Sequence, residues 1–280
     1  MKVVRQSKMK KWTEAYEVLI NSEHWSELKK YKHILSRNYV PSVKQIWWIL
    51  DDVWVRMGLN NRYYTEYQLQ KYYSHSVWFL NGLFIEVDEQ SIEHRKSLAK
   101  FFVNKKDLRI LDYGGGFGTL AKEIAKQTPS SIIEIYEPHA SKYAIDNIKE
   151  FNNIKIVDSI CEHNYDVVVN TDVLEHVENP IQLVGTFNQL LKDNGVLIAH
   201  WNFTPCIKCH LPKHFHFQYT FGSEIVPLLG FSKEISNRFH GHYYIKKKNI
   251  TPEDLKHAYF KEKLSKKLYT LNVIQEKFKK

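Results

Sequence analysis

The segment 108–127 constrains the fold more than any other part of the chain. An apolar run, Leu108–Tyr113, leads directly into Gly114-Gly115-Gly116-Phe117-Gly118, and an amphipathic stretch, Gly118–Gln127, follows. Glycine lets the backbone turn sharply and leaves room for a ligand against the main chain. A strand, a glycine-rich turn and a helix in this order predict the first βα unit of a nucleotide-binding sheet.

From residue 107 onward, short apolar runs alternate with amphipathic stretches, a pattern typical of βαβ units and a parallel sheet. A stop signal, Lys192-Asp193-Asn194-Gly195, predicts a helix end in which Gly195 takes the left-handed conformation. Two final extended runs around a short His-Gly turn predict a β-hairpin that gives the sheet an antiparallel edge. The predicted strands are Leu108–Tyr113, Ser131–Glu137, Ile154–Val157, Tyr165–Asn170, Gly195–Asn202, Phe231–Phe239 and His242–Lys248, and the predicted helices are Gly118–Gln127, His139–Phe151 and Asn179–Leu191.

The region before the sheet has a different character. Residues 12–103 contain no glycine-rich turn, are unusually aromatic and have a helical pattern. At the other end, Thr251-Pro252-Glu253 begins a Lys-rich stretch with proline in the first helical turn. We therefore expect a helical cap or lid over residues 1–104, a βα domain over residues 105–250 and a basic terminal helix over residues 251–280.

The composition sets the class of protein. An apolar fraction of 43% and a charged fraction of 25% are those of an ordinary soluble globular protein. The chain contains no run of about 18 apolar residues, which disfavours a membrane span. A polar N-terminus and three cysteines lead us to expect a chain without a signal peptide, with reduced thiols, in the cytoplasm.

The formal net charge of +9 is concentrated in the two ends of the chain. Residues 246–280 hold eleven lysines against four acidic residues, and residues 1–11 hold five basic residues and no acidic one. A nucleic-acid enzyme usually carries its basic surface around the active site. We therefore expect solvated basic ends and a small-molecule partner, and we disfavour nucleic acid, with RNA held by the basic ends as the alternative.

The glycine turn by itself has two interpretations. Residues 116–121 fit the G-x-G-x-x-G/A pattern of dinucleotide-binding folds, so an NAD oxidoreductase is one alternative. Asp112 stands two residues before Gly114, where a carboxylate would repel a pyrophosphate but suits a ligand with an amine and a sulfonium. Glu137 closes the next predicted strand, where a carboxylate can accept hydrogen bonds from both ribose hydroxyls. Asp112 therefore favours S-adenosylmethionine, whereas Glu137 fits either cofactor.

With these motifs, residues 90–248 resemble the class I S-adenosylmethionine-dependent methyltransferases, in particular the small-molecule family that includes the ubiquinone-biosynthesis type. The resemblance implies a Rossmann-like, seven-stranded, mostly parallel sheet with an antiparallel C-terminal hairpin, and S-adenosylmethionine as cofactor. In the motif Leu190–Leu197, the family usually has two glycines where this chain has Asn194-Gly195. The motifs are Leu111–Gly118, Glu137, Leu174-Glu175-His176-Val177, Pro180, Leu190–Leu197, His216–Phe221 and Leu228–Phe231.

The resemblance also implies roles for individual residues. The backbone of Gly114–Gly118 and the side chain of Asp112 would hold the methionine end of the cofactor, and Glu137 the ribose. Asp158 and Ser159 match the position that meets the adenine amine. Asn170 and Thr171 fall where the fourth strand faces the transferable methyl group.

The methyl acceptor is less constrained. The sequence Asn170-Thr171-Asp172-Val173 lacks the Asn/Asp-Pro-Pro-aromatic tetrapeptide that grips amides or exocyclic amines, so we favour O-methylation of a small molecule. A methyltransferase fold retained only for binding is a further alternative. From the aromatic region and from the loops after the strands, we predict these substrate-binding residues: Tyr72, Tyr73, His75, Trp78, His176 and His200.

A hydroxyl acceptor must lose a proton, and histidine is the natural acceptor of that proton near neutral pH. His214 and His216 share one face if the stretch Lys213–Phe217 is extended. We therefore predict that His214 or His216 is the catalytic base.

The string Cys206-Ile207-Lys208-Cys209-His210 matches the c-type haem attachment pattern. Haem attachment requires export, for which we see no signal. Zinc held by these cysteines with His210, His214 and His216 is an alternative, but the spacing fits no common zinc finger. We therefore predict a substrate loop without a metal. The sequence leaves the oligomeric state open.

Overall fold

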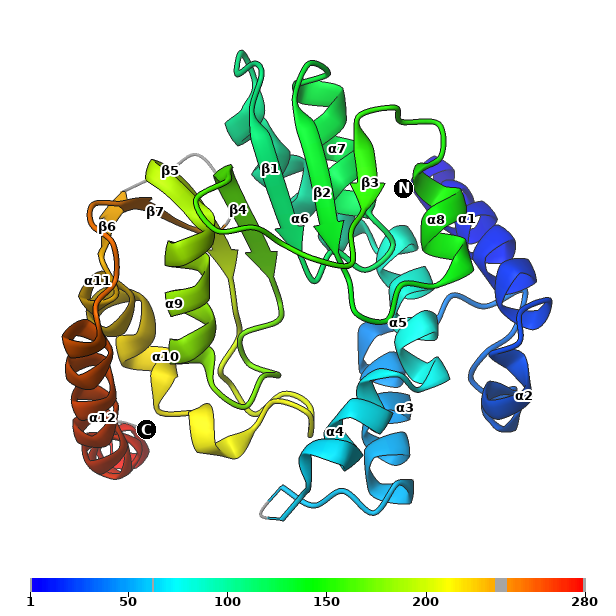
Figure 1. The fold of residues 1–280 in the computed structure, drawn as a ribbon. Helices are drawn as coiled ribbons and strands as arrows, with labels where there is room; N and C mark the ends of the chain where they lie inside the picture. Colours follow the sequence, from blue (N-terminus) through cyan, green and yellow to red (C-terminus); the bar gives the residue numbers. More distant parts are fainter. Residues whose placement is uncertain (1, 62, 235–240, 279–280) are drawn as a thin grey trace.

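A computed structural model describes residues 2–61, 63–234 and 241–278, with side chains described from residue 6 to residue 269 within these ranges. A twisted sheet flanked by helices forms one part of the molecule, and a group of N-terminal helices lies beside it (Figure 1).

The sheet has seven strands in the order β3-β2-β1-β4-β5-β7-β6, which confirms the predicted fold class. Strand β7 pairs antiparallel with both β5 and β6, so the antiparallel pair β6–β7 ends the sheet, as predicted. The predicted strand Phe231–Phe239 is described as far as Glu234, and its remainder lies outside the described residues. The strands are β1 Arg109–Tyr113, β2 Ile132–Tyr136, β3 Ile154–Ile156, β4 Tyr165–Thr171, β5 Leu191–His200, β6 Phe231–Glu234 and β7 His242–Lys246.

Local sequence explains the helices between the strands. Helix α7 (Thr119–Gln127) turns a strip of small and branched apolar side chains, Leu120 to Ala125, into the sheet. Helix α8 (Lys142–Ile148) is shorter than predicted because the Ser141 hydroxyl caps it by accepting from the Ala144 amide at 3.1 Å. Helix α9 (Pro180–Leu190) begins with proline in its first turn after the Asn179 cap.

The predicted stop signal is corrected by the structure, because α9 ends at Leu190 and residues 192–195 lie within β5. Asn194, with φ 61°, takes the left-handed conformation that we assigned to Gly195. Gly195 is required for another reason, because a Cβ atom there would lie 2.9 Å from the carbonyl oxygen of Lys192. The glycine in this stop signal therefore permits a close approach, while the asparagine makes the turn.

The N-terminal region is helical, as expected, and mostly has a core of its own. Trp12, Tyr31, Trp54 and Tyr72 are all fully buried in it, and each such side chain contributes roughly 2–3 kcal/mol through burial. Its last helix, α6, packs instead against α7 and the sheet, through Leu98 and Ala99. The core of the sheet domain therefore begins before residue 105, where we predicted the domain boundary. The helices are α1 Lys2–Ile20, α2 Trp25–Leu28, α3 Val43–Arg56, α4 Glu66–Tyr73, α5 Ser76–Val87 and α6 Glu89–Ala99, with 3₁₀ turns at Lys29–Tyr31 and Lys100–Phe102.

The C-terminal part covers the other side of the sheet. Helices α10 (Phe217–Thr220) and α11 (Val226–Leu228) lie between β5 and β6 in the chain and pack against the long helix α12 (Pro252–Phe278). A 3₁₀ turn at Pro212–His214 precedes α10, and a π-helical turn at Phe221–Ile225 precedes α11. As predicted, α12 begins at Pro252.

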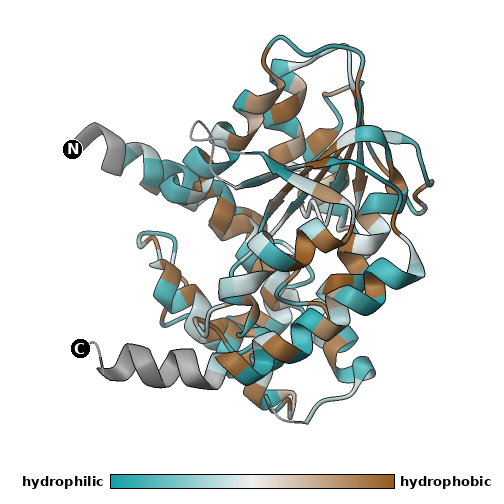
Figure 2. Cartoon of the chain, turned by 90° about the vertical axis from the view of Figure 1, so that its left-hand side faces the viewer, coloured by the Kyte–Doolittle hydropathy of each residue, from teal (hydrophilic) through white to brown (hydrophobic). Residues whose placement is uncertain are grey.

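Helix α12 is packed against the protein, so the expectation of a solvated tail is wrong for residues 252–269. Ala258 and Ser265 are buried against the C-terminal elements, and α12 contacts α9 and α11. Its outer side mixes hydrophilic with hydrophobic residues (Figure 2), among them the exposed Phe260 and Leu268. No helix within the described ranges is long and apolar enough to cross a membrane.

Candidate functional site

The candidate site lies at the carboxyl ends of β1, β2, β4 and β5, the edge at which open parallel sheets bind ligands. The glycine turn follows β1, Glu137 follows β2, Asp172 follows β4, and His200 ends β5. The register places Tyr113 beside Asn170 and Thr171 beside His200, so these groups lie along one edge of the sheet.

Left-handed glycines shape the turn itself. Gly114, Gly116 and Gly118 have φ values of 75°, 54° and 73°. The amide of Gly116 donates a 3.1 Å hydrogen bond to Oε2 of Glu137, and Oε1 of Glu137 accepts from the amide of His139 at 3.1 Å. The two predicted cofactor elements, the turn and Glu137, are therefore in direct contact.

Two glycines of the turn give a matched test of its construction. A Cβ atom at Gly118 would lie 2.6 Å from Cγ2 of Ile148, whereas one at Gly116 would meet nothing within 4 Å. Replacing either with alanine strains the backbone by about 1–2 kcal/mol, and Gly118→Ala adds overpacking of about 1–3 kcal/mol. Urea unfolding should show a clearly larger loss of stability for Gly118→Ala than for Gly116→Ala. Equal losses would contradict the packing described here.

Asp112 lies beneath the turn, almost fully buried at 1% exposure. Its Oδ2 atom has no hydrogen-bond partner among the described residues, and a Cβ atom at Gly115 would lie 2.7 Å from it. Burial, helped by the negative charge of Glu137, raises the pKa of Asp112 to about 7. A buried carboxylate without a partner is costly, and a cationic ligand above it would offset that cost.

Asn170, on the neighbouring strand, presents a second unsatisfied oxygen. Its Nδ2 atom donates to the carbonyl oxygen of Tyr113 at 3.1 Å, while its Oδ1 atom is buried and without a partner in the described part of the chain. Asp158 and Ser159 are exposed just beyond β3, at the same edge of the sheet. The two buried acceptors, Oδ2 of Asp112 and Oδ1 of Asn170, suit a ligand that carries hydrogen-bond donors.

The N-terminal helices reach the site through α5. Phe117 packs so closely on this helix that a Cβ atom at Gly82 would lie 2.6 Å from Cε2 of the Phe117 ring. Glu86 of α5 accepts hydrogen bonds from the hydroxyls of Thr119 and Tyr143, each at 2.8 Å. Helix α5 is thereby hydrogen-bonded to the first residue of α7 and to α8.

A histidine–aspartate pair stands at the ends of the next two strands. Nδ1 of His200 lies 2.6 Å from Oδ1 of Asp172, and the ring of His94 lies 4.6 Å from that of His200, centroid to centroid. Burial works against the charged form of His200, but Asp172 outweighs it and raises the pKa of the imidazole above its ordinary 6.5. Sequence reasoning placed His200 among the substrate residues and missed Asp172 as its partner.

The predicted bases His214 and His216 have different surroundings. The stretch 213–217 is not extended, because Pro212 starts a 3₁₀ turn and α10 follows at Phe217. Both imidazoles are buried, and burial lowers their pKa values to about 4 and about 3. Nε2 of His214 lies 2.9 Å from the carbonyl oxygen of Val177, and Nε2 of His216 lies 3.7 Å from Glu262 on α12. The extended stretch on which the prediction rested is therefore not formed.

The predicted aromatic substrate residues divide into two kinds. Tyr73 donates from its hydroxyl to the carbonyl oxygen of His176 at 3.1 Å, and the Trp78 ring lies 5.6 Å from the His176 ring. Tyr72 is fully buried, and Nδ1 of His75 accepts from the Val77 amide as the cap of α5. Tyr73 and Trp78 therefore reach the loop after β4, whereas Tyr72 and His75 stabilise the N-terminal helices.

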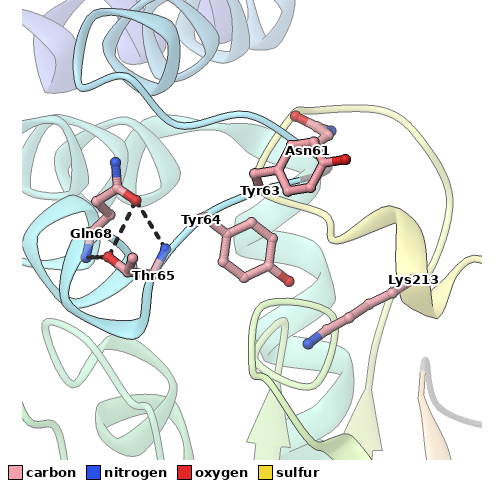
Figure 3. Close-up of a pocket in the computed structure, with 6 residues that line it drawn as sticks. All are labelled: Asn61, Tyr63, Tyr64, Thr65, Gln68 and Lys213. Atoms are coloured by element: carbon pink, nitrogen blue, oxygen red, sulfur yellow. Dashed lines mark hydrogen bonds between the residues drawn. The ribbon is translucent and has the colours of Figure 1, made fainter.

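A cavity of about 380 Å³ opens beside α4 (Figure 3). The Lys213 ammonium lies 5.7 Å from the centre of the Tyr64 ring there, and Thr65 and Gln68 form the capping box of α4. No residue of the glycine turn or of the His200–Asp172 pair lines this cavity. We therefore place the chemistry at the edge of the sheet.

Comparison with known proteins agrees with this geometry. Residues 88–220 match the family model of the methyltransferase domain. The chain is 31% identical over 135 residues to the ubiquinone biosynthesis O-methyltransferase of Rickettsia typhi, covering 45% of this chain and 55% of that protein. It is 34% identical over 97 residues to that of Rickettsia canadensis, covering 32% of this chain and 41% of the other. The chain thus spans about half the length of the curated relatives it matches.

Among solved structures, a SAM dependent methyltransferase from Aquifex aeolicus aligns with a TM-score of 0.46 at 14% identity. The alignment covers 57% of this chain and 94% of that one.

Proposed function

We propose that this chain, whose residues 88–220 match the methyltransferase domain, is a class I S-adenosylmethionine-dependent methyltransferase that methylates a hydroxyl group of a small molecule. The observation that carries the proposal is the 2.6 Å contact between His200 and Asp172 at the edge of the sheet where the glycine turn also lies. This pair supplies the proton acceptor that O-methylation requires.

The residues around the turn fit S-adenosylmethionine better than a dinucleotide. Asp112 places a buried carboxylate beneath the turn, which would repel a pyrophosphate, whereas Glu137 fits the ribose of either cofactor. Oδ2 of Asp112 and Oδ1 of Asn170 are buried acceptors that would take the cofactor's ammonium, and Glu137 would take its ribose hydroxyls. When bound, S-adenosylmethionine supplies a methyl carbon made electrophilic by its sulfonium.

His200 performs the proton transfer in this proposal. With Nδ1–H donating to Asp172, the neutral imidazole keeps the Nε2 lone pair for the acceptor's hydroxyl proton. Nε2 would take up the proton of the acceptor hydroxyl, and bound S-adenosylmethionine would supply the methyl group. Asp172 fixes the tautomer and stabilises the imidazolium that results.

A phenol is the acceptor that the surroundings favour. Tyr73 and Trp78 bring aromatic rings to His176, and flat aromatic surfaces suit a flat aromatic substrate. The two Rickettsia relatives described above are named ubiquinone biosynthesis O-methyltransferases, which supports oxygen as the acceptor atom.

The proposal is tested by methyl transfer from radiolabelled S-adenosylmethionine to paired acceptors that differ only at the reacting atom, such as 2-methoxyphenol and 2-methoxyaniline. We expect label in the phenol and background in the amine. Label in the amine alone would overturn the assignment of oxygen. Label in neither, with the cofactor bound, would favour a binding module.

Cofactor affinity should depend on pH through Asp112. The cofactor's ammonium prefers the ionised carboxylate, and the pKa of about 7 leaves mostly the neutral form at pH 6. Calorimetry should therefore give a dissociation constant about tenfold higher at pH 6 than at pH 8. A dissociation constant that does not change across this range would show that Asp112 does not meet the charged group.

A further inference from the structure

We propose that Glu175, His176 and His210 form a binding site for a divalent transition-metal ion. One ligand atom from each of the three side chains lies within 4.8 Å of the other two. Glu175 and His176 follow β4, and His210 belongs to the loop after β5, so the site joins two loops at the edge of the sheet. The proposal does not depend on methyl transfer and is tested separately from it.

Both imidazoles are oriented in the way that metal-binding histidines require. Nδ1 of His176 lies 3.2 Å from the carbonyl oxygen of Cys209, and Nδ1 of His210 lies 2.9 Å from that of Thr204. A ring that donates Nδ1–H to a carbonyl keeps its proton there and presents the Nε2 lone pair. The two backbone carbonyls therefore leave the Nε2 lone pair of each histidine available to bind a metal ion.

The carboxylate completes the set. Oε1 of Glu175 accepts from the amide of Asn202 at 2.9 Å, while Oε2 is buried with no hydrogen-bond partner within the described ranges. The side chain is only 1% exposed, so bulk solvent does not reach this oxygen. A cation at the centre of the group would stabilise it.

The donor set selects the kind of ion. Two imidazoles and one carboxylate suit zinc or iron(II) better than magnesium or calcium, which prefer oxygen ligands throughout. Three protein ligands leave a coordination position open for a further ligand. Zinc is the simplest occupant, because it requires no redox partner.

This site differs from the zinc site that the sequence offered. Sγ of Cys206 lies 3.3 Å from Nδ1 of His210, the ring nitrogen already occupied by Thr204. His214 and His216 contact Val177 and Glu262 instead. Only His210 of the cysteine–histidine string belongs to the group, joined by two residues that sequence reasoning did not consider as ligands.

The test uses the full chain stripped with a chelator and titrated with zinc against a chromophoric competitor. We expect one ion per chain, and Glu175→Gln and His210→Ala should each weaken zinc binding by at least about 100-fold. Cys206→Ser and His214→Gln are matched controls that should bind as the wild type does. Substoichiometric binding in the wild type, or unchanged binding in Glu175→Gln and His210→Ala, would overturn the proposal.

Cobalt substitution keeps the test decisive if a variant fails to fold. Bound to the wild-type chain, cobalt(II) should show visible bands of a nitrogen–oxygen site without a thiolate charge-transfer band. A thiolate band would assign the ion to the cysteines and contradict the proposal. Calorimetry with S-adenosylhomocysteine should give the same affinity in Glu175→Gln as in the wild type, so that failure of this site is distinguished from failure of the cofactor site.

Discussion

Replacing Asp112 with asparagine should abolish measurable S-adenosylmethionine binding and at the same time stabilise the cofactor-free protein above pH 7. The substitution keeps the shape of the side chain but removes the negative charge that would meet the cofactor's ammonium. Losing a charged partner in a buried site weakens binding by about 3–5 kcal/mol, which is more than 100-fold. Calorimetry measures this loss directly.

The stability effect follows from the pKa of Asp112. Burial raises that pKa from 3.8 to about 7, so the native state binds the proton more tightly than the unfolded chain does. The resulting stabilisation is complete below pH 3.8 and is lost as the pH rises to 7, which leaves a cost of a few kcal/mol in the ionised native state. Asparagine has no such cost, so its advantage in urea unfolding should be small at pH 4 and large at pH 8.

Asp158→Asn is the control for Asp112→Asn, because Asp158 is exposed. It should change neither the stability nor its dependence on pH. An Asp112→Asn variant that binds S-adenosylmethionine with wild-type affinity would contradict the cofactor site, whatever its stability.

Replacing His200 with alanine should lower kcat by about 10²–10⁴-fold while leaving the dissociation constant of S-adenosylmethionine unchanged. The pair with Asp172 raises the pKa of His200 above 6.5, and the base must be neutral, so wild-type turnover should rise with pH through that raised pKa. Asp172→Asn removes the charge that raises it. The rise should therefore move to lower pH in Asp172→Asn, with a reduced maximum.

His214→Gln and His216→Gln decide between the two sets of histidines. Both rings are buried against protein groups, so we expect their kcat values to stay within a fewfold of the wild type in folded protein. A large loss of kcat in either variant, with His200→Ala active, would restore the base predicted from the sequence.

Local patterns predicted the features that depend on neighbours in sequence. The turn at Gly114–Gly118, the strands on either side of it and the position of Asp112 follow from one continuous segment. The helical N-terminal region follows from its helical pattern, and the structure adds capping boxes such as Ser42 with Gln45. Such features can be predicted because the residues that form the pattern are also the residues whose conformations produce the structure.

Features that depend on strand pairing were less accessible. His200 and Asp172 are 28 residues apart and meet because β4 and β5 pair in parallel with Thr171 opposite His200. His214 and His216 seemed plausible because their spacing suits an extended chain, but Pro212 starts a helical turn. The strand register is not specified by any local sequence pattern, whereas Pro212 is a readable signal for a helical turn that the prediction did not use.

The most direct test of the central claim is the fate of a deuterated methyl group. The wild type and His200→Ala, each saturated with methyl-deuterated S-adenosylmethionine, would be mixed with catechol and the products identified by mass spectrometry and NMR. We expect a deuteromethyl ether in the wild type and a large loss of its formation rate in His200→Ala. Label on carbon or nitrogen, or equal rates of ether formation in the two proteins, would contradict this claim.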